Sequence, residues 1–389
     1  MKIAHNLSLL FWLSCYGAFV FAQSDSLNSS GKWFSKGYVK FLHTAYYLKP
    51  LDQIITDQLL HHRWNIRYYP HRHWTIRAEW RNRIFYGEVL KLNPDFAKQV
   101  DNVNNDYLDL SWVPVHHRQL VVHTMLDRLS LEYLKGNWEI RLGRQRVNWG
   151  IHTFWNANDI FNTFSFTDFD YEERPGSDAF SMRKYFSSSG SLELAIRAAD
   201  RWSQTTAGML WRFNRWRYDF QVLGGYTDPY AVGGIGWAGQ IGSLGWKGEW
   251  SYFAFARDDQ KDILTGSTGL DYVFSSGFFT QAGLFYNSAG SVNTPVSQLF
   301  QFKISPWSLY PYRWATYASA AYPFSPVINA SLSLVYSPVN SHPLFFSPGL
   351  TISAASDWDV DLIGQILYNQ ERKFISPIQA FFLRVKYSY

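Results

Sequence analysis

The sequence is nearly free of cysteine and has no long apolar run in its main part. Its only cysteine, Cys15, lies in an N-terminal segment that we expect to be removed. Residues 23–389 then hold no thiol, which excludes disulfides, thiolate catalysis and zinc–thiolate sites. After Gln23 no window reaches roughly 18 consecutive apolar residues, so a transmembrane helix is excluded as well.

Catalytic and metal-binding motifs are also missing. Neither a GxSxG elbow nor an HExxH pair occurs, although His123, Asp127 and Ser130 share one stretch. A nucleophilic serine needs an adjacent base and an orienting group. The histidines follow strand and turn spacing and not ligand spacing. We therefore expect no enzyme activity, no metal and no cofactor.

The basic balance of the chain does not indicate nucleic-acid binding. The sequence pI is about 9.0. A nucleic-acid footprint is one exposed basic patch, whereas here the basic residues alternate with aromatic and aliphatic ones. The positive charge is concentrated instead in residues 31–150, with 18 Lys and Arg against 11 Asp and Glu.

The first residues have the parts of a secretory signal peptide. Lys2 gives a positive start, residues 7–21 are mostly apolar, and Val20 and Ala22 are the small residues expected before a cut at Gln23. Trp12 makes a lipoprotein signal at Cys15 the poorer interpretation. We predict a signal peptide over residues 1–22 and a short polar periplasmic leader over residues 23–36.

Aromatic residues are abundant, at 19% of the chain with 18 Trp, 25 Tyr and 30 Phe. Girdles at the two bilayer interfaces of a membrane β-barrel use many such residues. The last strand fits this. It carries one apolar face at period two, made of Phe381, Leu383, Val385, Tyr387 and Tyr389. That face predicts a lipid-facing strand, and its aromatic end resembles the C-terminal assembly signal of bacterial outer-membrane barrels. The alternative is an amphipathic edge strand of a soluble protein.

Alternating segments continue along nearly the whole chain. Residues 58–69 and 74–86 form a clear hairpin pattern. The alternation changes phase near Asp127, which predicts a β-bulge or a strand end there. We expect a second bulge at Gly143, or an exit from the hydrocarbon layer by Arg144. The fold class is all-β: one transmembrane antiparallel up-and-down β-barrel over residues 37–389, with roughly 16–18 strands.

Turn composition predicts which end is which. The tight turns at 188–190, 242–243 and 275–277 are typical of periplasmic turns. The stretches 293–311 and 337–348 carry several prolines and are typical of outer loops. The longest connection, residues 151–178, is acidic and aromatic and follows a basic strand. We expect it to fold into the barrel mouth as a constriction. An extracellular cap or a latch between subunits is the alternative.

Charged residues on the predicted inner face and in this loop are the candidate lumen and constriction residues. They are Arg63, Arg67, Arg77, Arg81, Arg83, Arg141, Arg144, Arg146, Asp159, Asp168, Asp170, Glu172 and Glu173. Rows of arginine in a pore favour anions. Ion pairs that only stiffen the lumen are an equally good interpretation, and the two are compatible.

The segments 143–150 (GRQRVNWG) and 155–159 (WNAND) are similar to a motif in a poorly characterised group of porin-like Gram-negative outer-membrane β-barrels. That group is loosely similar to alginate-export and substrate-selective porins. Together with the signal peptide and the C-terminal strand, the resemblance implies a location in the outer membrane. Implied partners are outer-membrane lipid, lipopolysaccharide and the barrel-assembly machinery.

The sequence thus predicts a channel for passive diffusion of small polar, anionic solutes. The alternative is a structural, export or assembly barrel with a loop-plugged lumen that serves a partner complex. The sequence does not decide between a monomer and a homo-oligomer.

Overall fold

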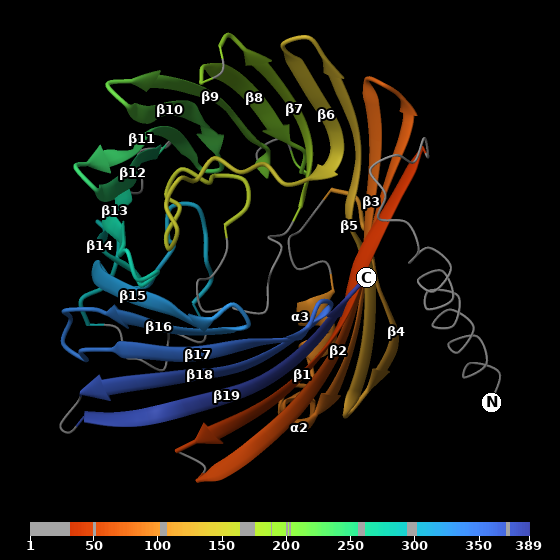
Figure 1. Ribbon diagram of the computed structural model, residues 1–389, viewed down its shortest axis with the longest axis vertical. Coiled ribbons are helices and arrows are strands. Elements are labelled where there is room, and N and C mark those ends of the chain that lie inside the picture. Colours follow the sequence, from red (N-terminus) through yellow and green to blue (C-terminus); the bar gives the residue numbers. More distant parts are fainter. Residues whose placement is uncertain are drawn as a thin grey trace.

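The computed structural model describes residues 32–49, 52–101, 107–163, 176–187, 189–199, 201, 204–255, 261–293, 302–370 and 374–389. The described residues form a ring of strands (Figure 1). The strands are β1 (Trp33–Leu48), β2 (Gln53–His71), β3 (Trp74–Gly87), β4 (Ser111–His117), β5 (Leu120–Lys135), β6 (Trp138–Gln145), β7 (Ser177–Tyr185), β8 (Ser191–Arg197), β9 (Thr206–Arg215), β10 (Tyr218–Thr227), β11 (Tyr230–Ile241), β12 (Leu244–Phe255), β13 (Ile263–Val273), β14 (Phe279–Asn287), β15 (Trp314–Ser325), β16 (Ile328–Tyr336), β17 (Leu344–Ala355), β18 (Trp358–Gln370) and β19 (Phe374–Ser388).

The sheet closes on itself. β1 pairs with β2 on one side and with β19 on the other, from Tyr38↔Ser388 to Leu48↔Ile378. β4 and β6 share one edge of β5: β4 pairs up to Met125 and β6 pairs from Leu129 onward. Of the 19 strands in the sheet, 18 therefore make the closed antiparallel barrel and β4 is an accessory strand. This confirms the predicted fold class and the upper end of the predicted strand number.

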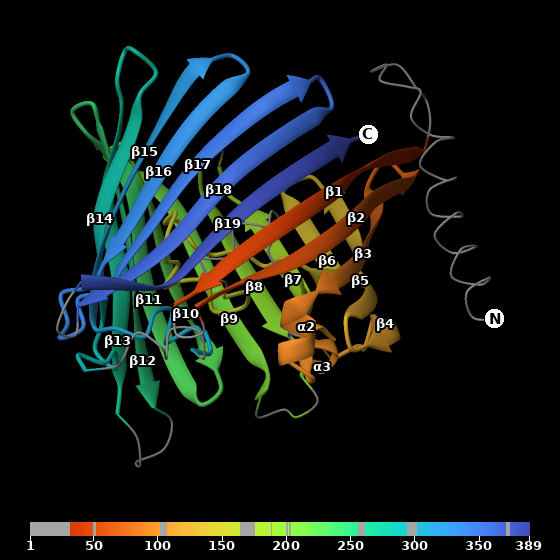
Figure 2. The same ribbon diagram turned by 90° about the horizontal axis from the view of Figure 1, so that it is seen from below.

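The two ends of the barrel differ as the turn composition predicts. Short turns such as 241–244 and 325–328 lie at the end where β19 finishes. The long connections 88–110, 146–176 and 288–313 lie at the other end. Two short helices, α2 (Glu88–Leu92) and α3 (Phe96–Val100), sit with β4 at that far end (Figure 2). Among the described residues no helix is both long and apolar enough to cross a membrane.

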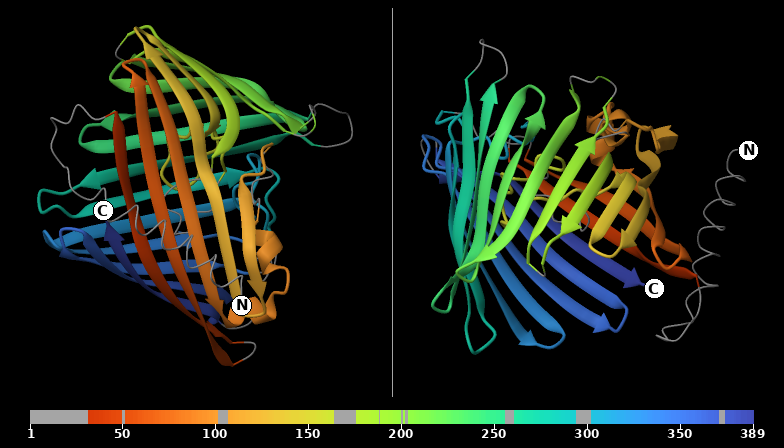
Figure 3. Two further views of the ribbon diagram at one scale, coloured as in Figure 1. Left: turned by 90° about the vertical axis from the view of Figure 1, so that its right-hand side faces the viewer. Right: turned by 90° about the horizontal axis from the view of Figure 1, so that it is seen from above.

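The two faces of the wall follow the alternation of the sequence. On β3 and β6, Trp80 and Leu142 point outward and are exposed. On β2 and β12, Arg63 and Glu249 point inward and are buried. Figure 3 shows the wall from two sides, with the strands tilted steeply around it. A strand tilt of this kind is what closure of a large sheet requires.

Two local expectations are resolved by the strand register. β3 and β5 shift register between Glu79 and Trp80, so Asp127 is the extra residue of a bulge, as predicted. β6 pairs with β5 and β7 without a break through Gly143 and Arg144. The expected bulge at Gly143 is therefore absent, and the chain leaves the sheet after Gln145.

The first strand begins earlier than its predicted start at residue 37. Trp33 already pairs with Tyr68 of β2, and the two rings stack with centroids 4.2 Å apart. Residues 33–36 are too polar for the expected pattern, because Ser35 and Lys36 interrupt it. The stacking and the β2 backbone supply the partner that the sequence pattern does not show.

Candidate functional site

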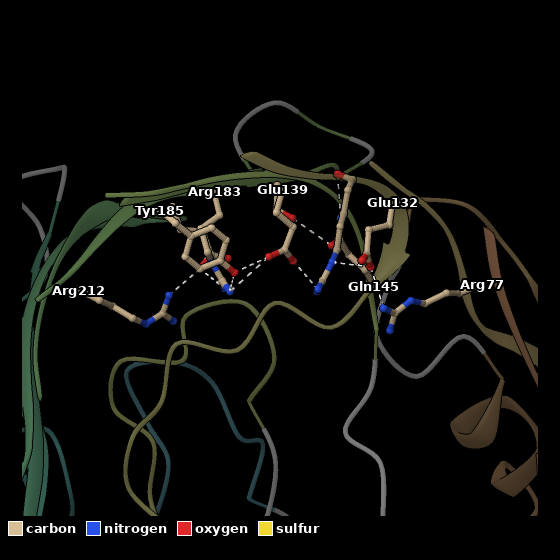
Figure 4. A network of polar contacts seen from close by, with 10 residues as sticks. Arg77, Glu132, Glu139, Gln145, Arg183, Tyr185 and Arg212 are labelled. Atoms are coloured by element: carbon tan, nitrogen blue, oxygen red, sulfur yellow. Dashed lines mark hydrogen bonds and ion pairs between the residues drawn. The ribbon is translucent and has the colours of Figure 1, made fainter. Parts of the chain in front are cut away.

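An alternating row of arginine and glutamate side chains crosses the inner wall from β3 to β9. We call it the charged ladder, and it consists of Arg77, Glu132, Arg141, Glu139, Arg183, Glu193 and Arg212 (Figure 4). All these side chains have the inward parity of their strands. Successive strands each place one or two of them at matching heights, so cross-strand neighbours form ion pairs.

The ladder contacts are short. Glu132 binds Arg77 at 2.8 Å and Arg141 at 3.1 Å. Glu193 binds Arg183 at 2.5 Å and Arg212 at 2.9 Å. These arginines are partly exposed, at 26–31%. The ladder therefore combines fixed geometry with guanidinium groups that still face the interior.

Glu139 links the two halves of the ladder. It pairs with Arg141 on its own strand and with Arg183 at 3.8 Å, and it accepts a 2.6 Å hydrogen bond from the Tyr185 hydroxyl. A cavity of about 470 Å³ lies against this part of the wall. It is bounded by the ladder, by the β7–β8 turn and by Arg146 and Asn148, which follow β6.

A second, buried cluster lies beside the ladder on β2, β3 and β5. Arg63 binds Glu79 at 2.5 Å and Asp127 at 2.7 Å, and its side chain is only 1% exposed. Arg81 also approaches Asp127, at 3.8 Å. The bulge makes this possible, because it turns both Asp127 and the following Arg128 inward. Such buried pairs hold the wall together, and removing one partner is costly.

The chain after β6 turns into the barrel. We call residues 146–163 the inner loop, and Figure 1 shows it inside the ring of strands. Glu249 of β12 is fully buried and accepts backbone hydrogen bonds from Ile151 (2.6 Å), His152 (3.3 Å) and Asn158 (3.4 Å). Three backbone N–H groups of the loop therefore converge on one buried carboxyl group. Glu249 thus holds the inner loop on the wall.

Further wall groups fix the same loop. Gln221 of β10 donates to the Trp149 carbonyl at 2.7 Å, and Ser267 of β13 donates to the Trp155 carbonyl at 2.8 Å. Wall glycines make room for it. A side chain at Gly208 would meet the Trp149 ring at 2.9 Å, and one at Gly236 would meet Ile151 at 2.9 Å. The loop is therefore seated in the wall by shape as well as by hydrogen bonds.

The tip of the inner loop carries a buried histidine. His152 Nδ1 accepts from the Phe154 amide at 3.2 Å, so its Nε2–H donates to the Tyr317 hydroxyl at 3.0 Å. Burial, with a smaller contribution from the Lys247 charge, lowers the pKa of His152 to about 4. The imidazole is therefore neutral at pH 7 and acts as a structural hydrogen-bonding group.

The predicted site residues fall into several groups. Arg77 and Arg141 belong to the ladder, and Arg146 lines the cavity. Arg63 and Arg81 belong to the buried cluster, while Arg83 donates to His123 at 3.0 Å. Arg67 lies over the Phe34 ring at 5.8 Å, near the beginning of β1.

Arg144 does not join the ladder. It has the parity of the outward Leu142 and makes a two-point contact with Asp178 of β7, with both distances 3.0 Å. It also donates to the Leu108 carbonyl. Asp159 is buried in the inner loop and accepts a hydrogen bond from the backbone N–H of Asn162 at 3.3 Å. Asp168, Asp170, Glu172 and Glu173 lie outside the described residues.

The C-terminal strand has the faces that its sequence indicates. Phe381 and Leu383 are exposed on the outer face, and Ala380 and Phe382 are buried on the inner one. Tyr389 ends the chain with its hydroxyl 2.9 Å from His62 Nε2. β19 pairs with β1 along the closing seam, and the Tyr389 hydroxyl reaches across β1 to β2.

Sequence reasoning missed several important residues. Glu132, Arg183, Glu193 and Arg212 complete the ladder, and Glu249 holds the inner loop. Inward parity was a usable signal for each, but only the register of neighbouring strands shows that they meet. Within the described ranges, no group of three or more His, Cys, Asp or Glu residues could hold a metal ion.

Comparison with known proteins identifies the fold. No family model matches the chain, and no curated protein matches it in sequence. Among solved structures, Acinetobacter baumannii OccAB4 is similar with a TM-score of 0.59 and 9% identity, over 94% of this chain and 100% of that one. The Pseudomonas aeruginosa outer-membrane protein OpdK gives 0.56 and 11%, over 92% and 98%.

Another OpdK structure contains vanillate and gives a TM-score of 0.53 at 11% identity, over 91% of this chain and 98% of that one. At such low identity the likeness concerns the fold alone. The chain is an 18-strand antiparallel β-barrel that resembles these outer-membrane proteins along nearly its whole length.

Proposed function

We propose that this protein is an outer-membrane channel for passive diffusion of small, polar, anionic solutes. The observation that carries the proposal is the charged ladder. It places four arginines on one side of the interior, each held by a glutamate yet still partly exposed. Arginine rows favour anions in a pore, and guanidinium groups recognise carboxylates with two parallel hydrogen bonds.

The inner loop supports the same function from the opposite side. It occupies part of the barrel interior and is held on β10, β12 and β13 by Gln221, Glu249 and Ser267. Its first residues, Arg146 and Asn148, line the cavity beside the ladder, so the loop narrows the passage at that point. OpdK, which has the same fold, was solved with vanillate, a carboxylate. That likeness supports an anionic solute for this chain.

Location and assembly follow from the same proposal. Residues 1–22 would direct secretion, and the outward face of β19 would be the signal read by the barrel-assembly machinery. The exposed apolar outer face would contact outer-membrane lipid and lipopolysaccharide. The ladder, being inside the barrel, would meet only solute and water.

A structural or export barrel with a plugged lumen is the second candidate. The extensive docking of the inner loop favours it, since Trp149 and Asn158 are fully buried in the interior. The barrel would then serve a partner complex and would not conduct solutes.

Planar-bilayer recording under a salt gradient separates the two. Discrete steps with an anion-biased reversal potential are the expected result. A silent bilayer, from protein whose heat-modifiable gel mobility shows that it is folded, would overturn the channel and favour the plugged barrel.

A further inference from the structure

The cavity against the charged ladder has a lining that is more selective than a ring of positive charge. We call it the ladder pocket. Its lining residues are Glu139, Arg141, Gln145, Arg146, Asn148, Ser181, Arg183, Tyr185, Ser189, Gly190, Ser191, Glu193 and Arg212. At about 470 Å³ it lies within the size range of small-molecule sites.

The net charge of the lining favours an anionic ligand. Four arginines and two glutamates face the pocket, so its formal charge is two positive. Arg212 uses one terminal nitrogen on Glu193 and makes only a long 3.4 Å contact from the other to the Asn148 carbonyl. Its fork is therefore the group best placed to receive a carboxylate.

The neutral part of the lining is hydrophilic. It offers the Asn148 amide and three serine hydroxyls, whereas the Gln145 amide already binds the Arg141 and Ala179 carbonyls and the Ser181 hydroxyl. Among the described residues the lining has no aliphatic side chain larger than a methylene stem. Tyr185 is the one aromatic ring among the described residues of the lining. An aromatic or aliphatic acid would set its apolar body against these polar groups, at a desolvation cost that little apolar contact would offset.

One acceptor has spare capacity. The contacts of Glu193 with Arg183 and Arg212 all involve Oε2, and among the described residues no contact reaches Oε1. A carboxylate oxygen accepts hydrogen bonds only. Beside the Arg212 fork, it would take a hydroxyl on the carbon next to the ligand carboxylate.

We propose that the ladder pocket is a binding site for a small polyhydroxylated carboxylate, that is, an acid of the aldonic or uronic type. Arg212 and Arg146 would receive its carboxylate, Glu193 Oε1 an adjacent hydroxyl, and Asn148 and the Ser189 hydroxyl the remaining hydroxyls. This inference rests on the proposed channel for its access route, but the site itself is defined by the lining.

Binding is tested by titration calorimetry on the full-length protein in detergent micelles. The probes are gluconate, benzoate, which has the charge without the hydroxyls, and glucitol, which has the hydroxyls without the charge. Gluconate should bind at least about tenfold more tightly than either. Equal or tighter binding of benzoate, or the absence of gluconate binding, would overturn the proposal.

Glu193→Gln gives a test of sign. It removes a negative charge, so binding of benzoate should strengthen, while the weakened hydroxyl acceptor should loosen binding of gluconate. If both probes strengthen together, the pocket reads charge alone and the proposal is wrong. Asn148→Ala on the inner loop is the second variant, should Glu193→Gln not fold. It should weaken gluconate only, and an equal effect on benzoate would count against the proposal.

Arg215→Gln is the matched control, because it lies on β9 with Arg212 but has the opposite parity, and it should change neither affinity. The bilayer experiment keeps the two proposals apart. Gluconate binding with a silent bilayer would refute the channel and leave the pocket. Anion-selective conductance without gluconate binding would do the reverse.

Discussion

Glu249 of β12 accepts the backbone N–H of Ile151 at 2.6 Å and is fully buried beneath the inner loop. The two residues are 98 positions apart in the chain, so this contact joins the connection after β6 to the opposite wall. The inner loop is therefore a fixed part of the barrel interior. Its position sets the width of the passage beside the charged ladder.

Replacing Glu249 by Gln should release the inner loop. The amide nitrogen of glutamine is itself a donor and would face backbone N–H groups that the carboxyl oxygens of Glu249 now accept. We expect the apparent melting temperature to fall, with a cost of about 2–3 kcal/mol, and single-channel current to become noisier. Tryptophan fluorescence on heating and bilayer recordings measure the two effects. Glu88→Gln is the control, because Glu88 is an exposed glutamate of α2 that accepts one backbone N–H, from Thr56 at 3.0 Å. Quiet, unchanged channels in Glu249→Gln would refute the anchoring role.

Arg212→Gln should reduce anion selectivity. It removes one positive charge from the end of the ladder while leaving Glu193 paired with Arg183 at 2.5 Å. Since arginine rows set the preference of a pore, the reversal potential under a salt gradient should move toward the cation side, by roughly a two- to fivefold change in permeability ratio. Arg215→Gln on the same strand should leave it in place. A reversal potential equal to that of the unaltered protein would argue against a ladder that acts on permeating ions.

The fold could be predicted from the sequence because the pattern of a barrel strand depends on residues that are close together in the chain. Alternation along 58–69 and 74–86, the phase change at Asp127 and the apolar face ending at Tyr389 each depend on neighbours in the chain. These signals give strands, faces and even the bulge. They do not separate β4 from a barrel strand, because its length and composition resemble one and only its pairing with β5 shows its accessory position.

The site was less predictable because it is made of cross-strand neighbours. Arg141 stood out by charge, but its partner Glu132 is identified only by the β5–β6 register. Arg144 was misleading for the opposite reason. Its spacing from Arg141 suggested a shared basic group, whereas the strand parity sends it outward to Asp178. Register depends on long-range pairing, and a single sequence does not contain it in readable form.

Acidification should destabilise the inner loop through His152. In the folded protein burial lowers the pKa of His152 to about 4, while an unfolded histidine has a pKa of about 6.5. Between these values the unfolded state binds a proton that the folded state does not. The contribution of His152 to stability should therefore be constant above about pH 6.5 and fall by up to about 3 kcal/mol as the pH drops toward 4.

We would test this pH dependence by measuring melting temperatures from pH 8 to 4 for the unaltered protein and for His152→Gln. The variant should show a shallower loss over that window, because its side chain takes up no proton. Parallel curves for the two proteins would show that His152 does not contribute to the acid sensitivity.

Arg144→Ala should be among the most destabilising changes in the wall. Arg144 and Asp178 are 2% and 6% exposed and share a two-point contact, and the same arginine binds the Leu108 carbonyl. Its loss leaves a buried carboxylate without its cation, at a cost of about 3–5 kcal/mol. Arg144→Ala with Asp178→Ala should recover part of that cost, because the uncompensated charge is gone. A double-mutant cycle of unfolding free energies gives the coupling energy between Arg144 and Asp178.

Lys98→Ala is the control. It breaks a surface ion pair between Lys98 and Asp95, whose side chains are 85% and 66% exposed, and it should cost less than about 1 kcal/mol of stability. If Arg144→Ala is as mild as this control, the contact does not hold the segment around Leu108 to the barrel.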